Sequence, residues 1–298
     1  MSKAAPALPQ RKSTNVRLSA FRVLFRALSA IAPAAAAELA MALFRRPPRH
    51  RGSESERATL EKAERTDLSL DGRHVAIWRW GKGPAVLLVH GWGSRGSRLA
   101  PFIAPLTDAG FSVVAFDAPG HGASAGRLSS LPQFISAISA VARKIGGVEA
   151  IVAHSMGGAA ATLAMARGLS TRRAVFLAPA ADPAGYSERF AKIVGLTPPV
   201  LARMKQSIER RFGEKWEDFD VLRAAREMTA PLLVFHDRED RDVAWTDGAA
   251  IAAAWPGAEL VSTVGLGHRR IVQDPDVVSR AVAFVSGSGA ATRASGGA

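Results

Sequence analysis

The stretch Ala153-His154-Ser155-Met156-Gly157-Gly158 decides which fold the sequence predicts. It follows an apolar run at 148–152 and opens a segment of small residues at 159–167, so it predicts a strand, a sharp turn and a helix in that order. A serine at such a turn is presented as a nucleophile, and the residues two before and two after it must be small because backbone passes close by. Gly157 satisfies this requirement, and Ala153, where the usual pattern has glycine, adds only one methyl group.

A second apolar run, at 85–90, predicts a buried parallel strand that ends in His90-Gly91-Trp92-Gly93. In a strand–turn–helix site, one N–H donor to an oxyanion comes from the residue after the nucleophile, and the other comes from the loop after an earlier strand. Met156 and Trp92 are the candidate donors by this rule. We interpret His90 as structural, because a histidine at a strand end beside glycine more often bonds nearby groups than acts as a general base.

The apolar run at 111–116 predicts another buried strand, and the turn-rich segment 117–124 follows it. Such a segment lies at the carboxyl edge of a parallel sheet, where ligands bind. Asp117 and His121 are therefore expected near the site. Their sequence neighbours are also typical of turns in which side chains bond the local backbone, and we favour that local role for both.

Two further apolar runs, at 231–236 and 259–264, each lead into residues that can complete a catalytic site. Four carboxylates lie within 237–242, and one of them can orient a general base. His268 follows Gly267 directly after the second run and is the candidate base. We interpret the adjacent Arg269 and Arg270 as a solvated helix start.

Residues 66–286, about three quarters of the chain, resemble a bacterial α/β hydrolase of the serine esterase, lipase and aminopeptidase-like group. The resemblance implies the α/β-hydrolase fold, with a mostly parallel eight-stranded sheet, helices on both faces and a small helical lid after strand six. The chain order nucleophile, acid, base is the one this fold uses.

The resemblance also assigns roles to individual positions. It implies Ser155 as nucleophile, His268 as base, the backbone N–H groups of Trp92 and Met156 as oxyanion hole, and His90, Gly91, His154 and Gly157 as residues that support the motifs. Asp240 is the preferred acid, because its spacing from His236 and Val243 resembles the acid loop of these hydrolases. Glu239 and Asp242 remain alternatives, and Asp237 occupies a position that is often glycine.

The nucleophile also indicates the class of reaction, because related dehalogenases and epoxide hydrolases have aspartate where Ser155 stands. A serine implies attack on a small-molecule ester, thioester or amide, with an acyl-enzyme that water hydrolyses. This chemistry requires neither a metal nor an organic cofactor. Two alternatives remain: a non-catalytic binding module, and an acyltransferase or perhydrolase that uses the same triad. Trp92 and the alanine-rich helix favour short to medium acyl chains.

The lid is expected at about 180–229, between the sixth and seventh strands. Within it, Met204, Ile208, Phe212 and Trp216 recur at spacings of four, which predicts one apolar helix face. We interpret this face as packed on the hydrolase body rather than as a substrate groove.

Charge is concentrated at the N-terminus of this chain of 298 residues, which has a net charge of +13 and no cysteine. Residues 1–52 contain ten Lys or Arg residues against one acidic residue, Glu38, a net charge of +9. The excess lies in a segment without a nucleic-acid-binding motif, so nucleic acid is disfavoured as a partner. The absence of cysteine excludes disulfides and thiol catalysis.

The basic extension at 1–52 is expected to be helical, with a helix pair over 16–44 interrupted by Pro33. Three interpretations remain open: packing on the hydrolase body, peripheral contact with a membrane surface, and a secretory signal. A membrane span is excluded because Arg22, Arg26 and Glu38 interrupt every sufficiently long window. We expect a cytoplasmic protein, with membrane association as an alternative and secretion less favoured. Residues 53–65 are expected to form a linker and 287–298 a flexible tail.

Overall fold

The computed structural model describes residues 12–287. The chain divides into two compact units, and each is described by itself. The larger unit comprises Arg45–Pro183 and Glu217–Ala298, and the smaller one comprises Met1–Phe44 and Ala184–Trp216.

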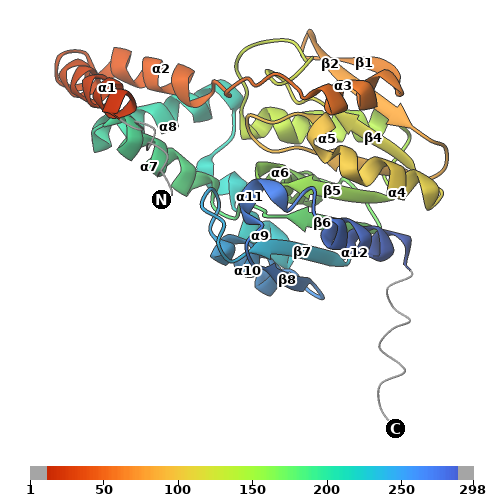
Figure 1. The fold of residues 1–298 in the computed structure, drawn as a ribbon. Coiled ribbons are helices and arrows are strands. Elements are labelled where there is room, and N and C mark those ends of the chain that lie inside the picture. Colours follow the sequence, from red (N-terminus) through yellow and green to blue (C-terminus); the bar gives the residue numbers. More distant parts are fainter. Residues whose placement is uncertain (1–11, 288–298) are drawn as a thin grey trace, which may run out of the picture. The chain divides into compact units, whose positions relative to one another are not determined.

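The larger unit contains an eight-stranded sheet in the order β1-β2-β4-β3-β5-β6-β7-β8 (Figure 1). β2 pairs antiparallel with both β1 and β4, and all other neighbours are parallel. The strands are β1 (Glu64–Leu70), β2 (Arg73–Trp80), β3 (Ala85–Val89), β4 (Ser112–Phe116), β5 (Ala150–His154), β6 (Arg173–Leu177), β7 (Leu232–Asp237) and β8 (Glu259–Thr263).

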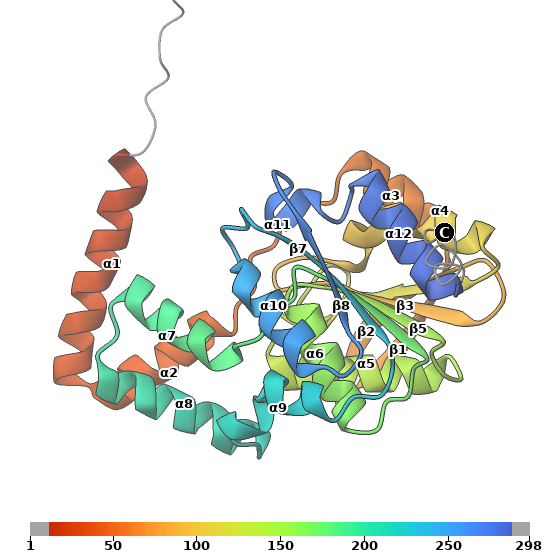
Figure 2. The same ribbon diagram turned by 90° about the horizontal axis from the view of Figure 1, so that it is seen from below.

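The two faces of the sheet are covered by different helices (Figure 2). Successive side chains of a strand point to opposite faces, so in β3 Leu87 and Val89 join one hydrophobic cluster and Val86 and Leu88 join the other. The first cluster includes residues of α5 (Leu131–Lys144), α6 (Met156–Ala166), α9 (Val221–Arg226) and α10 (Trp245–Ala254). The second includes residues of the 3₁₀ segment η1 (Gly96–Phe102), α4 (Ile103–Asp108) and α12 (Pro275–Ser286).

This architecture confirms the predicted fold class. The five apolar runs identified in the sequence coincide with β3, β4, β5, β7 and β8, and their ends differ by no more than two residues. β3, β4, β5 and β7 are buried on both faces, and a strand of that kind is recognisable as a continuous apolar run, whereas the edge strand β8 is only partly buried.

Part of the segment predicted as a linker is helical. Residues 54–61 form α3 (Glu54–Glu61). The Ser53 side chain accepts a hydrogen bond from the Glu56 backbone N–H, and the Glu56 side chain accepts one from the Ser53 N–H. This capping box satisfies N–H groups that would otherwise lack partners at the helix start, which explains why a short polar segment is helical here.

The smaller unit consists of α1 (Lys12–Ile31), α2 (Pro33–Phe44), α7 (Pro183–Val194) and α8 (Pro198–Phe212), and the 3₁₀ turn η2 (Trp216–Phe219) begins at its end. Pro33 is the first residue of α2, a position where a missing N–H costs little. The core of the unit contains Phe25 of α1, Ala36, Ala37, Ala40 and Met41 of α2, and Val200, Met204 and Ile208 of α8.

The N-terminal extension therefore packs against the segment predicted as a lid. Met204 and Ile208 are buried in this core, and Phe212 and Trp216 pack against it. For the apolar stripe of the insertion the sequence predicted the hydrolase body as packing partner, and the structure instead places it in a core shared with α1 and α2. For the N-terminal extension, packing on the body was one of three open interpretations. The alanines of α2 allow the close approach of α8, and such pairing cannot be read from either segment alone.

Candidate active site

The central element of the candidate site is the turn between β5 and α6. All residues of β5 are buried, and Ser155 links the strand to the helix with φ 57° and ψ −127°. A positive φ strains a residue that has a Cβ atom, by about 1–3 kcal/mol, and such strain persists only where the surroundings enforce it. Here the Ser155 N–H donates to the Leu177 carbonyl at 2.9 Å, which ties the turn to the end of β6.

Two glycines allow the backbone to approach this turn. A Cβ atom on Gly157 would lie 2.7 Å from the carbonyl oxygens of both Val89 and His90. A Cβ atom on Gly91 would lie 2.8 Å from the Ser155 Cβ. The end of β3 can therefore reach the serine only because both positions lack a side chain. Ala153, which replaces the usual glycine, is fully buried within β5.

The structure brings Ser155, His268 and Asp240 together in one line of hydrogen bonds. His268 Nε2 lies 3.0 Å from Ser155 Oγ, and His268 Nδ1 lies 2.7 Å from Asp240 Oδ2. Because an ionised carboxylate only accepts, Nδ1 carries the proton and Nε2 is left to accept the serine proton. The His268 side chain is 12% exposed and that of Asp240 is fully buried.

The surroundings of Asp240 distinguish it from the alternative acids. Its Oδ1 accepts the backbone N–H groups of Asp242 and Val243 at 2.8 and 2.9 Å. Burial by itself raises the pKa of Asp240, but hydrogen bonds from His236, His268 and Val243 outweigh it and hold the pKa well below the usual value. The Asp242 side chain is half exposed and pairs with Arg269 instead. The geometry thus favours Asp240 over Asp242 as the carboxylate that orients His268.

His268, the candidate base, is also held by His154. His154 Nε2 donates to the His268 carbonyl oxygen at 2.9 Å, and the two imidazole rings lie 4.6 Å apart. Burial and the nearby His268 ring lower the pKa of His154 to about 3. His154 is therefore a neutral donor that anchors the backbone of His268.

The two backbone N–H groups predicted as the oxyanion hole belong to the loop after β3 and to the first turn of α6. Within residues 12–287, neither the Trp92 nor the Met156 N–H donates to a protein acceptor. Unpaired N–H groups on the two chain segments that meet at Ser155 can bind a developing oxyanion.

Buried polar residues hold the loop after β3 in place. His90 Nδ1 donates to the Gly91 carbonyl at 2.7 Å, and its Nε2 accepts the Ala118 N–H. His121 Nε2 accepts the Gly93 N–H at 3.0 Å. The Asp117 carboxylate accepts the N–H groups of Gly96 and Ala123, both at 2.7 Å. These contacts fit the local, structural roles that the sequence indicated for all three side chains.

Burial keeps both of these histidines neutral. It lowers the pKa of His90 to about 4, and together with the neighbouring His90 ring it lowers the pKa of His121 to about 3. The same desolvation raises the pKa of the Asp117 carboxyl group.

Two residues near Asp240 have positioning contacts that the sequence did not reveal. Asp237 Oδ2 accepts from Thr263 Oγ1 at 2.8 Å and from the Leu266 N–H at 2.9 Å, which ties β7 to the loop that carries His268. His236 is fully buried and lies beside Asp240. The sequence placed both residues at the end of an apolar run and counted Asp237 among the candidate carboxylates, but it indicated no positioning contact for either.

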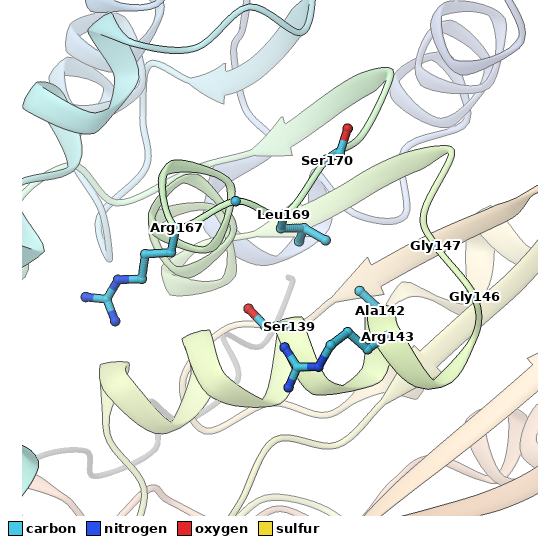
Figure 3. Close-up of a pocket in the computed structure, with 9 residues that line it drawn as sticks. Ser139, Ala142, Arg143, Gly146, Gly147, Arg167, Leu169 and Ser170 are labelled. Carbon is cyan, nitrogen blue, oxygen red and sulfur yellow. The ribbon is translucent and has the colours of Figure 1, made fainter.

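A cavity of about 430 Å³ lies elsewhere on the larger unit (Figure 3). It is lined by Ser139, Ala142, Arg143, Gly146, Gly147, Arg167, Gly168, Leu169 and Ser170. These residues belong to the ends of α5 and α6 and to the loops before β5 and β6, whereas Ser155 follows the opposite end of β5. Arg143 and Arg167 offset the partial negative charge at helix C-termini, and no predicted site residue lines this cavity.

Comparison with known proteins identifies an esterase and an acetyltransferase component as relatives. The chain is 27% identical over 246 residues to a pimeloyl-[acyl-carrier protein] methyl ester esterase of Stenotrophomonas maltophilia, which covers 68% of this chain and 92% of the relative. It is 35% identical over 126 residues to the dihydrolipoyllysine-residue acetyltransferase component of the acetoin cleaving system of Cupriavidus necator. That match covers 41% of this chain and 32% of the relative, so the chain spans only about a third of that protein.

Solved structures agree on the fold. An esterase from Rhodococcus sp. ECU1013 superposes with a TM-score of 0.57 at 19% identity, over 76% of this chain and 98% of the esterase. The model of the alpha/beta hydrolase family matches residues 86–281, which is more than half of the sequence. Because this match extends from β3 to α12 and includes Ser155, Asp240 and His268, the chain belongs to the alpha/beta hydrolase family.

Proposed function

We propose that this protein is a serine hydrolase that cleaves carboxylic esters of small molecules through an acyl-enzyme. Family membership and esterase relatives support a hydrolase. The observation that carries the finer proposal is the pair of contacts of His268, 3.0 Å to Ser155 Oγ and 2.7 Å to Asp240 Oδ2. A serine hydroxyl group that contacts a histidine base can be activated as a nucleophile when a carboxylate holds that base from the other side.

The proposed reaction begins when His268 Nε2 takes the proton of Ser155 as Oγ attacks the ester carbonyl carbon. The negative charge that develops on the carbonyl oxygen is bound by the N–H groups of Trp92 and Met156. The buried Asp240 carboxylate stabilises the resulting imidazolium. His268 then gives its proton to the leaving alcohol, and the acyl-enzyme forms as the C–O bond breaks.

The second half of the reaction releases the acid. His268 takes a proton from water, which attacks the acyl carbon, and the proton passes to Ser155 Oγ as the acyl–serine bond breaks. Every proton is carried by His268, which is why its two hydrogen bonds support the proposal more strongly than any other contact.

The test is labelling of the purified protein with a fluorophosphonate, which phosphonylates activated serines, followed by hydrolysis of p-nitrophenyl esters of increasing acyl length. Labelling is expected for the wild type and not for Ser155→Ala or His268→Ala. Esters of short to medium chain length are expected to react fastest.

Two outcomes would replace this proposal. A folded wild type that is neither labelled nor active would favour a non-catalytic binding module. Labelling together with acyl transfer to alcohols or peroxide faster than to water would favour an acyltransferase or perhydrolase with the same triad.

A further inference from the structure

An apolar surface lies on α1, on the side away from the core of the smaller unit. Val23, Leu24 and Ile31 are 66%, 57% and 84% exposed, and Ala27 and Ala30 between them are also exposed. At about 100° per residue, these five positions fall within an arc of about 120° on the helix. Phe25, on the other side of the helix, is fully buried. We call these five residues the outer face of α1.

Exposed apolar side chains are concentrated in the smaller unit. Among the described residues, the large apolar side chains that are exposed are Val23, Leu24, Ile31, Leu39, Ile193 and Val264. All except Val264 belong to this unit. A single exposed apolar residue needs no explanation, whereas a group on one helix face marks an interaction surface.

Positive charge is concentrated in the same unit. Residues 1–44 and 184–216 contain thirteen Lys or Arg residues against four acidic residues, so they hold +9 of the chain's net +13. On α1, Arg22 and Arg26 are exposed and border the outer face. Arg22 Nε also donates to the Ile193 carbonyl at 2.9 Å, which connects α1 to α7 near another exposed apolar residue.

We propose that the smaller unit binds the surface of an anionic lipid bilayer through the outer face of α1. A bilayer surface combines negative headgroups with an apolar layer just below them, and both features of this unit are complementary to it. A second copy of the chain would bring two surfaces of the same high positive charge together, which is unfavourable. Nucleic acid would use the charge and leave the apolar face exposed.

The proposed contact is peripheral. No helix within the described part of the chain is long and apolar enough to span a membrane. Only side chains on one face of α1 make the contact, and these side chains set how deeply the unit enters the lipid layer. Because the insertion between β6 and β7 is folded into the same unit as α1, the proposed contact also brings that insertion to the lipid surface.

The test is co-sedimentation of the full chain with vesicles of phosphatidylcholine alone and with vesicles that also contain phosphatidylglycerol. The protein is expected to bind the mixed vesicles and to remain in solution with phosphatidylcholine alone. Added salt is expected to weaken the binding, because the Debye length falls from about 10 Å at 0.1 M to about 3 Å at 1 M.

Variants test whether vesicle binding depends on the outer face of α1 or on exposed apolar and charged residues in general. Val23→Gln, Leu24→Gln and Ile31→Gln combined are expected to weaken vesicle binding by about tenfold or more, because apolar contact and electrostatic attraction act together. Val264→Gln, which changes the comparably exposed valine of the larger unit, is the matched control and is expected to bind like the wild type. Arg26→Gln is expected to weaken binding more than Arg143→Gln, an exposed arginine of the larger unit.

Melting temperature and circular dichroism establish that each variant is folded before binding is compared. The proposal is overturned if the wild type does not bind mixed vesicles at low salt, or if the folded triple variant binds as well as the wild type. It is also overturned if the wild type does not bind vesicles but forms a dimer in solution that the triple substitution abolishes. In that case a second copy of the chain covers the outer face of α1.

Discussion

His236 Nε2 lies 3.5 Å from Asp240 Oδ2, the same oxygen that accepts the 2.7 Å hydrogen bond from His268 Nδ1. His236 Nε2 is also 3.1 Å from the Val243 carbonyl oxygen, which only accepts, so Nε2 carries a proton. The Nε2–H group of His236 therefore faces both the Asp240 carboxylate and the Val243 carbonyl oxygen, which belongs to the turn that carries Asp240. Gly248 packs against this ring, and a Cβ atom there would lie 2.3 Å from His236 Nδ1.

His236→Leu is predicted to reduce kcat by about tenfold with little change in KM, because the carboxylate loses a charge-assisted donor worth about 1.5–3 kcal/mol. His236→Gln, which can keep an N–H donor near the same place, is predicted to retain most of the activity. Steady-state kinetics on a p-nitrophenyl ester compares the two. Equal losses in both variants would mean that the ring only fills space.

Asp240→Asn is predicted to reduce kcat by about 10⁴, because an amide cannot hold His268 in the required tautomer and cannot stabilise the imidazolium. Asp242→Asn is predicted to change kcat by less than about threefold, since its exposed pair with Arg269 contributes little. The measurement is kcat for both variants on one ester. A larger loss for Asp242→Asn would show that the acid has been assigned to the wrong residue.

Gly157→Ala is predicted to destabilise the fold by about 1–3 kcal/mol, because the added methyl group would meet two backbone carbonyls at 2.7 Å. Ala153→Gly restores the usual glycine two residues before the serine. It is predicted to keep activity and to lose only about 0.5–1 kcal/mol through backbone entropy in the strand. Denaturant unfolding checks both values. A Gly157→Ala protein as stable as the wild type would contradict the close approach of β3.

The free energy of unfolding is predicted to fall as the pH is lowered from 6.5 toward 4. Burial lowers the pKa of His90 to about 4 and those of His121 and His154 to about 3, from 6.5. Between these values the unfolded chain binds protons on the three rings and the folded chain does not, so acid favours unfolding. The contribution is fully present above pH 6.5.

Asp240 adds to the acid lability at lower pH, because its folded pKa lies below 3.8 and its stabilising contribution is lost as the carboxylate is protonated. Melting temperatures measured at intervals from pH 8 to pH 4 test the dependence on the histidines. A melting temperature that does not change between pH 6.5 and pH 4 would mean that these rings are not buried as described.

Much of the fold could be predicted from the sequence because buried parallel strands are continuous apolar runs. The runs at 85–90, 111–116 and 231–236 identified β3, β4 and β7 to within one residue. β1 and β2 were not identified individually, since β1 is mostly exposed and polar. The capping box of α3 is present in the sequence as Ser53 and Glu56, but the flanking Pro and Gly residues indicate a linker instead.

The sequence by itself determined the positions of five parallel strands along the chain, the position of Ser155 at a strand–helix turn, and the residues able to act as base and acid. These depend on local pattern and spacing. Only the tertiary structure decided that His268 reaches both Ser155 and Asp240, that His236, Asp237 and His154 hold these groups in place, and that the N-terminal helices pack with the insertion after β6. Such contacts join residues far apart in the chain, and no local sequence pattern records which buried surfaces meet.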